Sequence, residues 1–284
     1  MSPLIRPTGP QLVLGCGYLG RRVALRWLAE GRSVAALTRK NADALRGAGI
    51  EPITGDILAP ESLHTLPHAN TVLYAVGMDR SAGRSMREVY VTGLAHVLTT
   101  LPPYSRFIYA SSTSVYGQTN SDWVTESAPT QPSEDSGQIV LEAERLLRSR
   151  KPDAIILRFA GLYGPDRLLR KQPVLKGEPL VGDADKWLNL VHIADAASAV
   201  LWAEAHAVPG ETYNVADGTP VSRRDFYTRL AELLRAPEAK FDSRPEPGAP
   251  NRRIDATKFR ALGWMPAFAS YREGLTAAVA ESTM

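Results

Sequence analysis

Short apolar runs alternate with longer segments of helical periodicity through the first half of the chain. The periodic segments predict helices near 19–30, 41–48, 86–101 and 138–150. The apolar runs between them predict strands near 11–15, 33–38, 51–54, 71–75, 106–110 and 154–158. Strands that alternate with helices favour a parallel sheet covered on both faces. The pattern therefore predicts an α/β protein with a doubly wound parallel sheet.

The alternation becomes less regular after residue 158. Strands are predicted at 188–192 and 213–215, and a helix over 222–234 and a segment over 256–281 close the chain. We predict a larger domain of residues 1–165, to which 188–215 returns, and a smaller C-terminal lobe of 166–187 and 216–284. The proline-rich run 244–250 is a candidate linker within this lobe. The long polar connection 111–137 has the length of loops that line functional sites.

Composition excludes several classes of function. The 284-residue chain carries a formal net charge of only +3 with dispersed basic residues, which disfavours a nucleic-acid partner. No stretch approaches the roughly 18 apolar residues of a membrane span, so no membrane association is expected. Cys16 is the single cysteine, which is consistent with a reducing compartment, and we expect a cytoplasmic protein. His64 and His68 have helical spacing but no acidic or cysteine partner nearby, so no metal site is predicted.

A glycine-rich motif follows the first predicted strand directly. Residues 15–20 (GCGYLG) have the G-x-G-x-x-G spacing and open the first predicted helix, which is the context that makes this motif a dinucleotide signal. Gly15 allows the tight turn, Gly17 lets backbone approach a pyrophosphate, and Gly20 permits close packing of helix on strand. The helix N-terminus adds free N–H groups and a positive dipole end. We therefore predict a Rossmann-type dinucleotide-binding domain. Cys16 is either a reactive thiol at this helix end or a small residue that fits the turn.

The end of the second predicted strand bears on the choice of cofactor. An NAD site places a carboxylate there for the ribose 2′-OH, whereas a 2′-phosphate favours arginine and no carboxylate. This strand ends with Thr38, Arg39 and Lys40, and a guanidinium can bind a phosphate bidentately. We favour NADP(H) over NAD(H). The alternative is that the basic pair is a solvated start to the next helix.

Several segments together resemble one protein family. They are 111–117 (SSTSVYG), 157–165 (LRFAGLYGP), 189–195 (NLVHIAD), 262–266 (LGWMP) and 273–275 (EGL). In this order they resemble the extended short-chain dehydrogenase/reductases, the group that includes nucleotide-sugar epimerases and dehydratases. The resemblance spans nearly the whole chain and implies a Rossmann domain with a smaller substrate lobe.

The resemblance adds cofactor contacts to those of the glycine loop. It implies that Asp56 and Ile57 flank the adenine, although Asp56 also suits a turn after the third strand. It implies further that 75–77 lines the ribose side and that 159–162 contacts nicotinamide. The predicted cofactor-binding residues are Gly15, Gly17, Tyr18, Leu19, Gly20, Thr38, Arg39, Lys40, Asp56, Ile57, Ala75, Val76, Gly77, Ser111, Phe159 and Leu162.

The chain departs from the family at the catalytic pair. Relatives carry a tyrosine and a lysine at i, i+4 on one helix, where the ammonium lowers the pKa of the phenol and the pair exchanges a proton with substrate. Here Ser136 takes the tyrosine position and Val140 the lysine position. Neither Tyr nor Lys occurs from 117 to 150, and no tyrosine of the chain has lysine four residues later, so realignment cannot restore the pair. Loss of a positioned acid/base costs about 10²–10⁴-fold in rate.

Other residues are candidates to replace the missing pair. Ser112 and Thr113 occupy the family's hydroxyl position, or they cap the strand end. Tyr163 is expected on the nicotinamide side, where it either reaches substrate or stabilises a turn. Glu134 and Asp135 favour the start of the following helix, and a role as base is a weaker alternative. The candidate catalytic residues are Ser112, Thr113, Ser136 and Tyr163.

The resemblance also indicates substrate contacts. Asn189 and one of Arg252 or Arg253 match positions where relatives hold nucleotide-sugar phosphates, and each arginine is equally consistent with a surface residue. Trp187 stacks on a substrate ring or packs within the lobe. Tyr116 belongs to the same candidate set, with structural packing as its alternative.

Two classes of function fit these residues. The first is an NADP(H)-binding oxidoreductase or epimerase-like enzyme that acts on a small polar, nucleotide-sugar-like metabolite. The second is a non-catalytic dinucleotide-binding protein that senses redox state or supports a partner protein, for which the missing catalytic pair is the argument. Relatives often dimerise through the helices near 86–101 and 138–150, so a homodimer is a further expectation.

Overall fold

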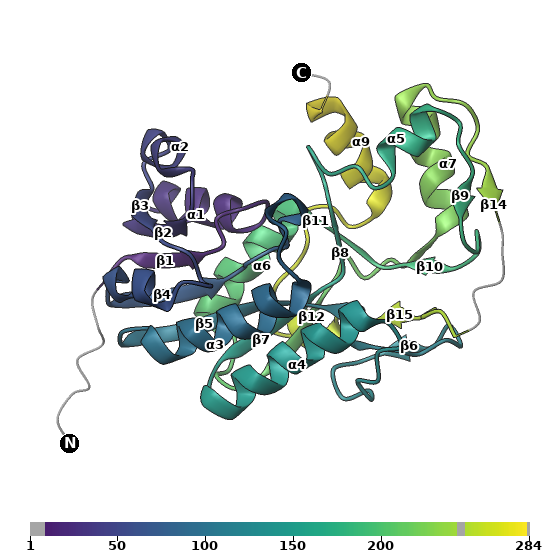
Figure 1. Cartoon of the computed structure of the whole chain (residues 1–284). Helices are drawn as coiled ribbons and strands as arrows, with labels where there is room; N and C mark the ends of the chain where they lie inside the picture. Colours follow the sequence, from purple (N-terminus) through teal and green to yellow (C-terminus); the bar gives the residue numbers. More distant parts are fainter. Residues whose placement is uncertain (1–8, 243–247, 283–284) are drawn as a thin grey trace. The chain divides into compact units, whose positions relative to one another are not determined.

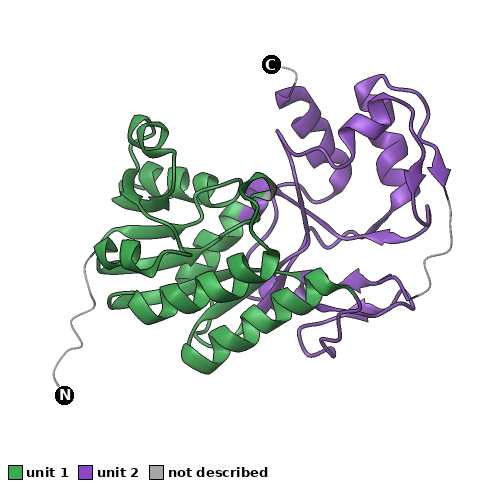
Figure 2. Cartoon of the chain, in the orientation of Figure 1, with its two compact units in different colours: residues 1–112, 134–158, 197–212 green, residues 113–133, 159–196, 213–284 purple. Residues whose placement is uncertain are grey.

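The computed structural model describes residues 9–242 and 248–282 and divides into two compact units (Figure 2). Unit 1 comprises residues 1–112, 134–158 and 197–212, and unit 2 comprises residues 113–133, 159–196 and 213–284. The units differ from the predicted domains chiefly at 113–133, which groups with the C-terminal residues. Backbone pairing explains this, because β6 (Trp123–Val124) lies parallel to β15 (Arg253–Ile254).

A seven-stranded sheet confirms the predicted fold class (Figure 1). Its order is β12-β7-β5-β4-β1-β2-β3, and the pairs β1–β2, β1–β4, β2–β3 and β4–β5 are all parallel. Each strand predicted for this sheet is present, with ends shifted by no more than two residues. The strands are β1 (Gln11–Leu14), β2 (Val34–Thr38), β3 (Glu51–Thr54), β4 (Ala69–Tyr74), β5 (Tyr104–Ser112), β7 (Ile155–Phe159) and β12 (Thr212–Val215). The strand predicted at 188–192 instead forms two short strands outside this sheet, β10 (Trp187–Leu188) and β11 (Leu190–His192).

The central strands are buried on both faces. In β1 and β4, Leu12, Leu14, Val72 and Tyr74 join one hydrophobic cluster with side chains of the helices α3 (Gly93–Thr100) and α4 (Asp135–Arg150). Because successive side chains of a strand point to opposite faces, Val13 faces away from this cluster. Val13 is also fully buried, so the opposite face of the sheet is covered as well. Burial on both faces is why these strands read as continuous apolar runs in the sequence.

The other helices of unit 1 are α1 (Gly20–Ala29), α2 (Ala42–Gly47) and most of α6 (Ile193–His206). The helix predicted over 86–101 differs in its first turns, where Glu88–Thr92 form a π-helical turn before α3 begins. The helix predicted from 138 begins three residues earlier, at Asp135. Boundaries of this kind depend on local hydrogen bonding that apolar periodicity does not encode.

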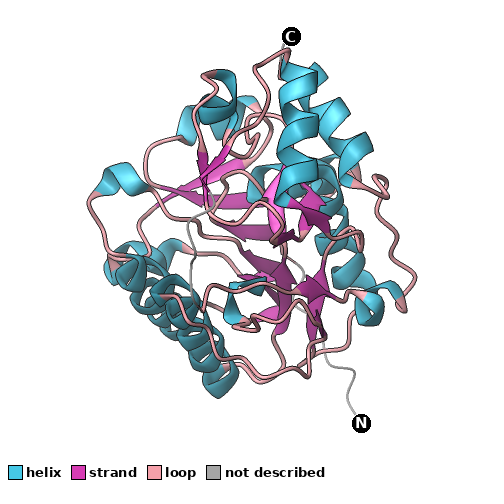
Figure 3. Cartoon of the chain, turned by 90° about the vertical axis from the view of Figure 1, so that its right-hand side faces the viewer, coloured by secondary structure: helices cyan, strands magenta, loops and turns pink. Residues whose placement is uncertain are grey.

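Unit 2 is built from short strands and helices, which Figure 3 shows by secondary structure. It has its own hydrophobic cluster. Tyr163, Phe226, Leu230 and Leu275 lie at the centre of this cluster. The segment over 256–281 contains two helices, because Gly263 at φ 93° and Pro266 interrupt it. Residues 244–247 of the candidate linker 244–250 lie outside the described residues. The elements of unit 2 are β6, β8 (Gly161–Tyr163), α5 (Lys171–Leu175), β9 (Leu180–Val181), β10 (Trp187–Leu188), β11 (Leu190–His192), β13 (Val221–Ser222), α7 (Arg223–Leu234), β14 (Phe241–Asp242), β15, α8 (Thr257–Arg260) and α9 (Tyr271–Glu281).

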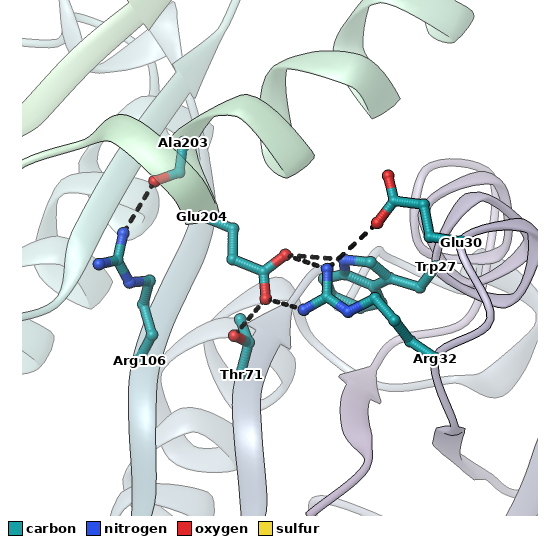
Figure 4. Close-up of polar contacts among 7 residues, drawn as sticks. All are labelled: Trp27, Glu30, Arg32, Thr71, Arg106, Ala203 and Glu204. Carbon is teal, nitrogen blue, oxygen red and sulfur yellow. Dashed lines mark hydrogen bonds and ion pairs between the residues drawn. The ribbon is translucent and has the colours of Figure 1, made fainter. Parts of the chain in front are cut away.

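A partly buried carboxylate connects α6 to the rest of unit 1 (Figure 4). Glu204 accepts hydrogen bonds from Trp27 Nε1 at 2.9 Å and from Thr71 Oγ1 at 2.5 Å. Arg32 completes the cluster with both terminal nitrogens of its guanidinium, one of them at 2.8 Å. The cluster joins the end of α1, the turn before β2 and the start of β4, at the edge of the sheet where the strands begin. Both oxygens of the Glu204 carboxylate accept hydrogen bonds, and these compensate for the loss of contact with water.

We predict that Glu204→Ala lowers the free energy of unfolding by about 2–4 kcal/mol. The substitution removes the acceptor of Trp27 and Thr71 and leaves the partly buried Arg32 guanidinium with Glu30, at 3.4 Å, as its remaining carboxylate. Chemical denaturation monitored by circular dichroism measures the change. The matched control is Glu142→Ala, which removes a carboxylate that pairs with Arg87 on the exposed surface and should cost no more than about 1 kcal/mol. Equal losses for the two variants would contradict the structural role of Glu204.

Candidate functional site

The first glycine of the loop lies directly against the end of β4. Gly15 has φ 96°, which L side chains rarely adopt, and a Cβ atom there would meet the backbone of Ala75 and Val76 at 2.5 Å. Ala75 N also donates to Leu14 O at 2.7 Å. The turn therefore requires glycine both for its conformation and for its close approach to the neighbouring strand.

The other two glycines have different surroundings. A Cβ at Gly20 would lie 2.2 Å from Gly15 O and 2.9 Å from Val13 Cγ1, so α1 can pack on β1 only without a side chain here. A Cβ at Gly17 would meet no atom within 4 Å, and its φ is ordinary. Folding therefore does not demand glycine at position 17. An open backbone at this point fits the approach of a pyrophosphate, as the motif predicts.

The start of α1 is arranged to receive an anion. The helix has no side-chain cap at its N-terminus and no acidic residue in its first turn. Arg22 lies there instead, and its guanidinium is 4.4 Å from the ring centroid of Tyr18 and donates to Tyr18 O at 2.9 Å. Uncapped N–H groups and a positive dipole end attract phosphate. The loop and helix together fit a dinucleotide pyrophosphate.

Cys16 is not a reactive thiol in this structure. Burial raises its pKa to about 11, an effect that Arg21 only partly opposes. The thiol is therefore protonated near neutral pH, and a protonated thiol is a weak nucleophile. The structure favours the alternative that Cys16 is a small residue fitting the turn.

The predicted adenosine contacts lie at the ends of β2 and β3. Arg39 and Lys40 are exposed just beyond β2, and Arg39 forms an ion pair with Asp79 at 2.8 Å. Asp56 Oδ1 accepts from Leu58 N at 2.9 Å, which is the turn geometry weighed for this residue. Ile57 packs on α3, where a Cβ at Gly93 would lie 2.4 Å from Ile57 Cδ1.

At the end of β5, Ser111 is held by a buried polar network. Its hydroxyl donates to Glu144 Oε1 at 2.5 Å. The Glu144 carboxylate also accepts from Arg158 Nε at 3.0 Å and from a terminal nitrogen of Arg158 at 2.7 Å. All three residues are buried. The network holds Ser111 in place directly before Ser112, and the Ser111 hydroxyl proton is already used in the hydrogen bond to Glu144.

Ser136 and Val140, the residues predicted to stand at the positions of the family's catalytic pair, lie on the first turns of α4. Ser136 is partly buried, and its hydroxyl lies 3.5 Å from Glu134 Oε2, at the outer limit of a hydrogen bond. Val140 is buried. An aliphatic side chain at this position supplies no charge that could lower the pKa of a neighbouring hydroxyl.

The two tyrosine candidates of unit 2 are interior residues. Tyr116 is fully buried, and its hydroxyl donates to Asn214 Oδ1 at 2.9 Å. Tyr163 is also fully buried, and its ring contacts His192 and Phe226 edge to face. Its hydroxyl lies close to Gly274, where a Cβ would be only 2.2 Å away. Burial raises the pKa of Tyr163 well above its usual range. The structure favours a packing role for both residues.

The predicted substrate residues gather in unit 2. Arg253 lies between two indole rings, 5.1 Å from the centroid of Trp123 and 5.5 Å from that of Trp187. Its Nε donates to Ser121 O at 2.9 Å. Its terminal nitrogens have no hydrogen-bond or ion-pair partner among residues 9–242 and 248–282. This free edge of the guanidinium can bind an anion.

Asn189 and Arg252 are used differently. Asn189 donates to Arg252 O at 2.9 Å and accepts from Ile254 N at 2.7 Å. Its side-chain amide therefore stabilises the backbone of β15. Arg252 donates to Thr113 O at 2.7 Å, which holds the turn after β5. Phe159 is buried and Leu162 is half-buried beside β11. Of the two arginines, the geometry favours Arg253 for binding an anion.

Sequence reasoning missed three residues of note. Asp79 lies in a loop and Trp123 in the two-residue strand β6, neither of which has a periodic pattern. Only the arrangement of distant strands brings them to Arg39 and Arg253. Asp217 follows β12 and is buried. Its Oδ1 accepts from Thr219 N at 2.9 Å, and its other carboxylate oxygen has no hydrogen bond within the described residues. No sequence signal marks these environments.

The parallel sheet, the glycine loop and the open helix terminus define a dinucleotide-binding α/β protein. The sequence model of the NAD dependent epimerase/dehydratase family matches residues 11–216, and the chain belongs to this family. This confirms the family resemblance noted in the sequence. In the part of the chain that the structure describes, no helix is long and apolar enough to span a membrane.

Several known proteins are similar along most of the chain. Protein YeeZ of Escherichia coli (strain K12) is 28% identical over 236 residues, which cover 78% of this chain and 82% of YeeZ. A putative NAD-dependent epimerase/dehydratase from Methylobacillus flagellatus has a TM-score of 0.79 at 28% identity, covering 98% of this chain and 100% of that one. The dTDP-glucose 4,6-dehydratase DesIV double mutant from Streptomyces venezuelae, with NAD and DAU bound, has a TM-score of 0.82 at 23% identity and 97% coverage of each chain. This last likeness shows the fold alone.

We predict that Gly17→Ala weakens cofactor binding without destabilising the fold. The added methyl group meets no protein atom, so the melting temperature should change by less than about 2 °C, whereas cofactor affinity should fall at least about tenfold because the methyl group occupies the approach to the pyrophosphate. Thermal melting and calorimetric titration measure the two effects. Gly47→Ala, also in open space, is the control. It should leave cofactor affinity unchanged, and its melting temperature should equal or slightly exceed that of the wild type because alanine favours the helix. If Gly17→Ala bound the cofactor as tightly as the wild type does, the predicted contact between the glycine loop and the pyrophosphate would be wrong.

We predict that Asp217 makes stability fall as pH rises. Burial raises the pKa of Asp217 from 3.8 to about 7. As pH rises, this carboxyl group loses its proton in the unfolded chain before it does so in the folded chain. The free energy of unfolding therefore declines between about pH 4 and pH 7, by at most about 4 kcal/mol, and stays level above pH 7. Denaturant unfolding across this range measures the slope.

Asp217→Asn should remove this decline, because asparagine does not titrate. The exposed Asp122→Asn is the control and should keep the wild-type slope. A slope in Asp217→Asn that equals the wild-type slope would rule out the assignment to this carboxyl group.

Proposed function

We propose that this protein is an NADP(H)-binding, atypical member of its family that acts as an oxidoreductase or epimerase-like enzyme on a small polar metabolite. The observation that carries the proposal is the cradle of Gly15, Gly17 and Gly20 at the open end of α1. Gly17 is the central argument, because the fold itself does not require glycine there. A position kept open without a folding need fits a ligand that approaches the backbone.

The preference for NADP(H) rests on the charges at the end of β2. Arg39 and Lys40 lie exposed where the adenine ribose is expected, and β2 ends without a carboxylate. Arg39 suits bidentate binding of a 2′-phosphate, and Lys40 adds a second positive charge. The preference for NADP(H) over NAD(H) should be moderate, because the Asp79 carboxylate already pairs with Arg39.

The nicotinamide ring supplies a hydride donor or acceptor when bound, as in other nicotinamide enzymes. The residues of this chain must then hold a substrate and move its proton. The hydroxyls of Ser112, Thr113 and Ser136 are the candidates for hydrogen bonding a carbonyl or alcohol oxygen. Ser136 has a carboxylate contact, to Glu134, that could accept its proton. A serine without a neighbouring ammonium is a weak acid, so slow turnover is expected.

The Trp123, Arg253 and Trp187 side chains support a polar, anionic substrate with a flat or ring-shaped part. The free edge of Arg253 suits a phosphate, and half-exposed Trp123 offers an indole face for stacking. A nucleotide-sugar-like metabolite has both features. Cytoplasmic location and a homodimer through α3 and α4 remain predictions.

One observation favours a second function, in which the protein binds the dinucleotide without turning over a substrate. Val140 is buried and uncharged, and Tyr163 packs in the interior of unit 2. The protein would then sense the redox state of NADP(H) or support a partner protein. This alternative predicts tight cofactor binding, no hydride transfer, and a partner association that differs between NADPH and NADP⁺.

Calorimetric titration of NADPH and NADH tests the cofactor proposal. We expect the wild type to bind NADPH more tightly, and Arg39→Gln to weaken NADPH binding about tenfold with little effect on NADH, since a charged hydrogen bond to phosphate is lost. Arg46→Gln, which removes an exposed arginine paired with Asp43 on α2, is the control. Tighter binding of NADH than NADPH would overturn the preference, and no binding of either would overturn the proposal.

Isotope exchange at the nicotinamide separates the enzyme from the sensor. NADPH labelled at C4 is incubated with panels of ketones, aldehydes and sugar nucleotides, and labelled products are counted. Transfer that depends on Ser136 or Ser112 supports the enzyme. Absence of transfer across the panels, combined with a pull-down partner released by NADP⁺ but not by NADPH, supports the sensor.

A further inference from the structure

An ion pair lies at the edge of the sheet where the dinucleotide is expected. Arg39 follows β2, and Asp79 lies in the loop after β4. These two strands are the neighbours of β1 on either side, and β1 leads into the glycine loop. Because the strands are parallel, their carboxyl ends share one edge of the sheet. The contact between Arg39 and Asp79 at 2.8 Å therefore connects the two strands that flank the glycine loop.

Asp79 is held in place by its own loop. Its Oδ1 accepts from Ser81 Oγ at 2.6 Å and from Ser81 N at 3.1 Å, while its Oδ2 faces Arg39. The hydrogen bond from the Ser81 hydroxyl, followed by that from Arg39, keeps the pKa of Asp79 below its usual range. The carboxylate is thus a fixed negative charge at neutral pH, and the Arg39 guanidinium is already partly neutralised.

This arrangement affects the two cofactors differently. A 2′-phosphate that binds Arg39 must share the guanidinium with Asp79 or displace it, and it approaches a fixed like charge. An unphosphorylated ribose brings no charge and leaves the ion pair intact. We propose that Asp79 is a specificity-determining residue that weakens binding of the 2′-phosphate and so narrows the difference between NADPH and NADH. The inference rests on the proposed NADP(H) site at Arg39.

The size of the effect follows from the exposure of the pair. Both side chains are more than two-fifths exposed, and exposed ion pairs contribute up to about fivefold to an equilibrium. Relief of repulsion from the phosphate adds to this. We expect Asp79→Asn to tighten NADPH binding about five- to tenfold and to change NADH binding less than twofold. Asparagine keeps a carbonyl oxygen for the Ser81 contacts, so the loop should be preserved.

The experiment measures dissociation constants of NADPH, NADH, adenosine 2′,5′-bisphosphate and 5′-AMP for the wild type and for Asp79→Asn, Arg39→Gln and the double variant. The bisphosphate and 5′-AMP isolate the ribose phosphate from nicotinamide. Asp43→Asn is the matched control, because Asp43 is an exposed carboxylate paired with Arg46 on α2. It should leave the ratio of NADPH to NADH affinity unchanged.

Selective tightening of NADPH and the bisphosphate by Asp79→Asn, largely lost when Arg39 is also replaced, supports the inference. Unchanged NADPH affinity, or equal tightening of NADPH and NADH, overturns it. If Arg39→Gln binds NADPH as well as the wild type does, the proposed cofactor contact fails. That result differs from a failure of Asp79 alone, in which Arg39→Gln weakens NADPH but Asp79→Asn has no selective effect.

Discussion

The close approach of backbone to backbone at the glycine loop is the constraint on which the site depends. At Gly15 and Gly20 there is no room for even one methyl group, because the loop touches the end of β4 and the first turn of α1 touches the loop. These contacts set where the helix begins, and with it the direction of the N–H groups at its N-terminus. Gly17 lies between the two crowded positions and faces open space. Two glycines thus serve packing, whereas the third is not required by packing.

Much of unit 1 could be predicted from the sequence, because its strands are buried on both faces and its helices have regular apolar spacing. Even Gly20, whose role depends on a contact with Val13, was predictable from motif spacing. The π-helical turn at 88–92 was not, since periodicity does not distinguish it from α-helix. The division of the chain also differed, because the pairing of β6 with β15 joins residues about 130 positions apart in sequence. Short strands of two residues leave almost no pattern to detect.

The candidate site shows the same limit. Arg39, Ser136 and Arg253 were identified from their positions relative to motifs, but their partners were not. Asp79 meets Arg39 only because β2 and β4 lie on either side of β1, and Trp123 meets Arg253 only through strand pairing. For Tyr163 the motif suggested proximity to the cofactor, whereas the hydrophobic cluster of unit 2 determines its burial. Motifs identify residues, and long-range packing decides what those residues can reach.

The polar cluster around Glu204 lies far from this chemistry, yet it bears on how the chain acquires its structure. The carboxylate is 133 residues from Thr71 and 177 from Trp27 in sequence. During synthesis at the ribosome, the early strands must wait for α6 to emerge, and the intervening residues of unit 2 are made first. Contacts between such distant residues form slowly. The sheet of unit 1 can therefore form all of its stabilising contacts only late in translation. At that point α6 is synthesised and Glu204 becomes available as the acceptor for Trp27 and Thr71.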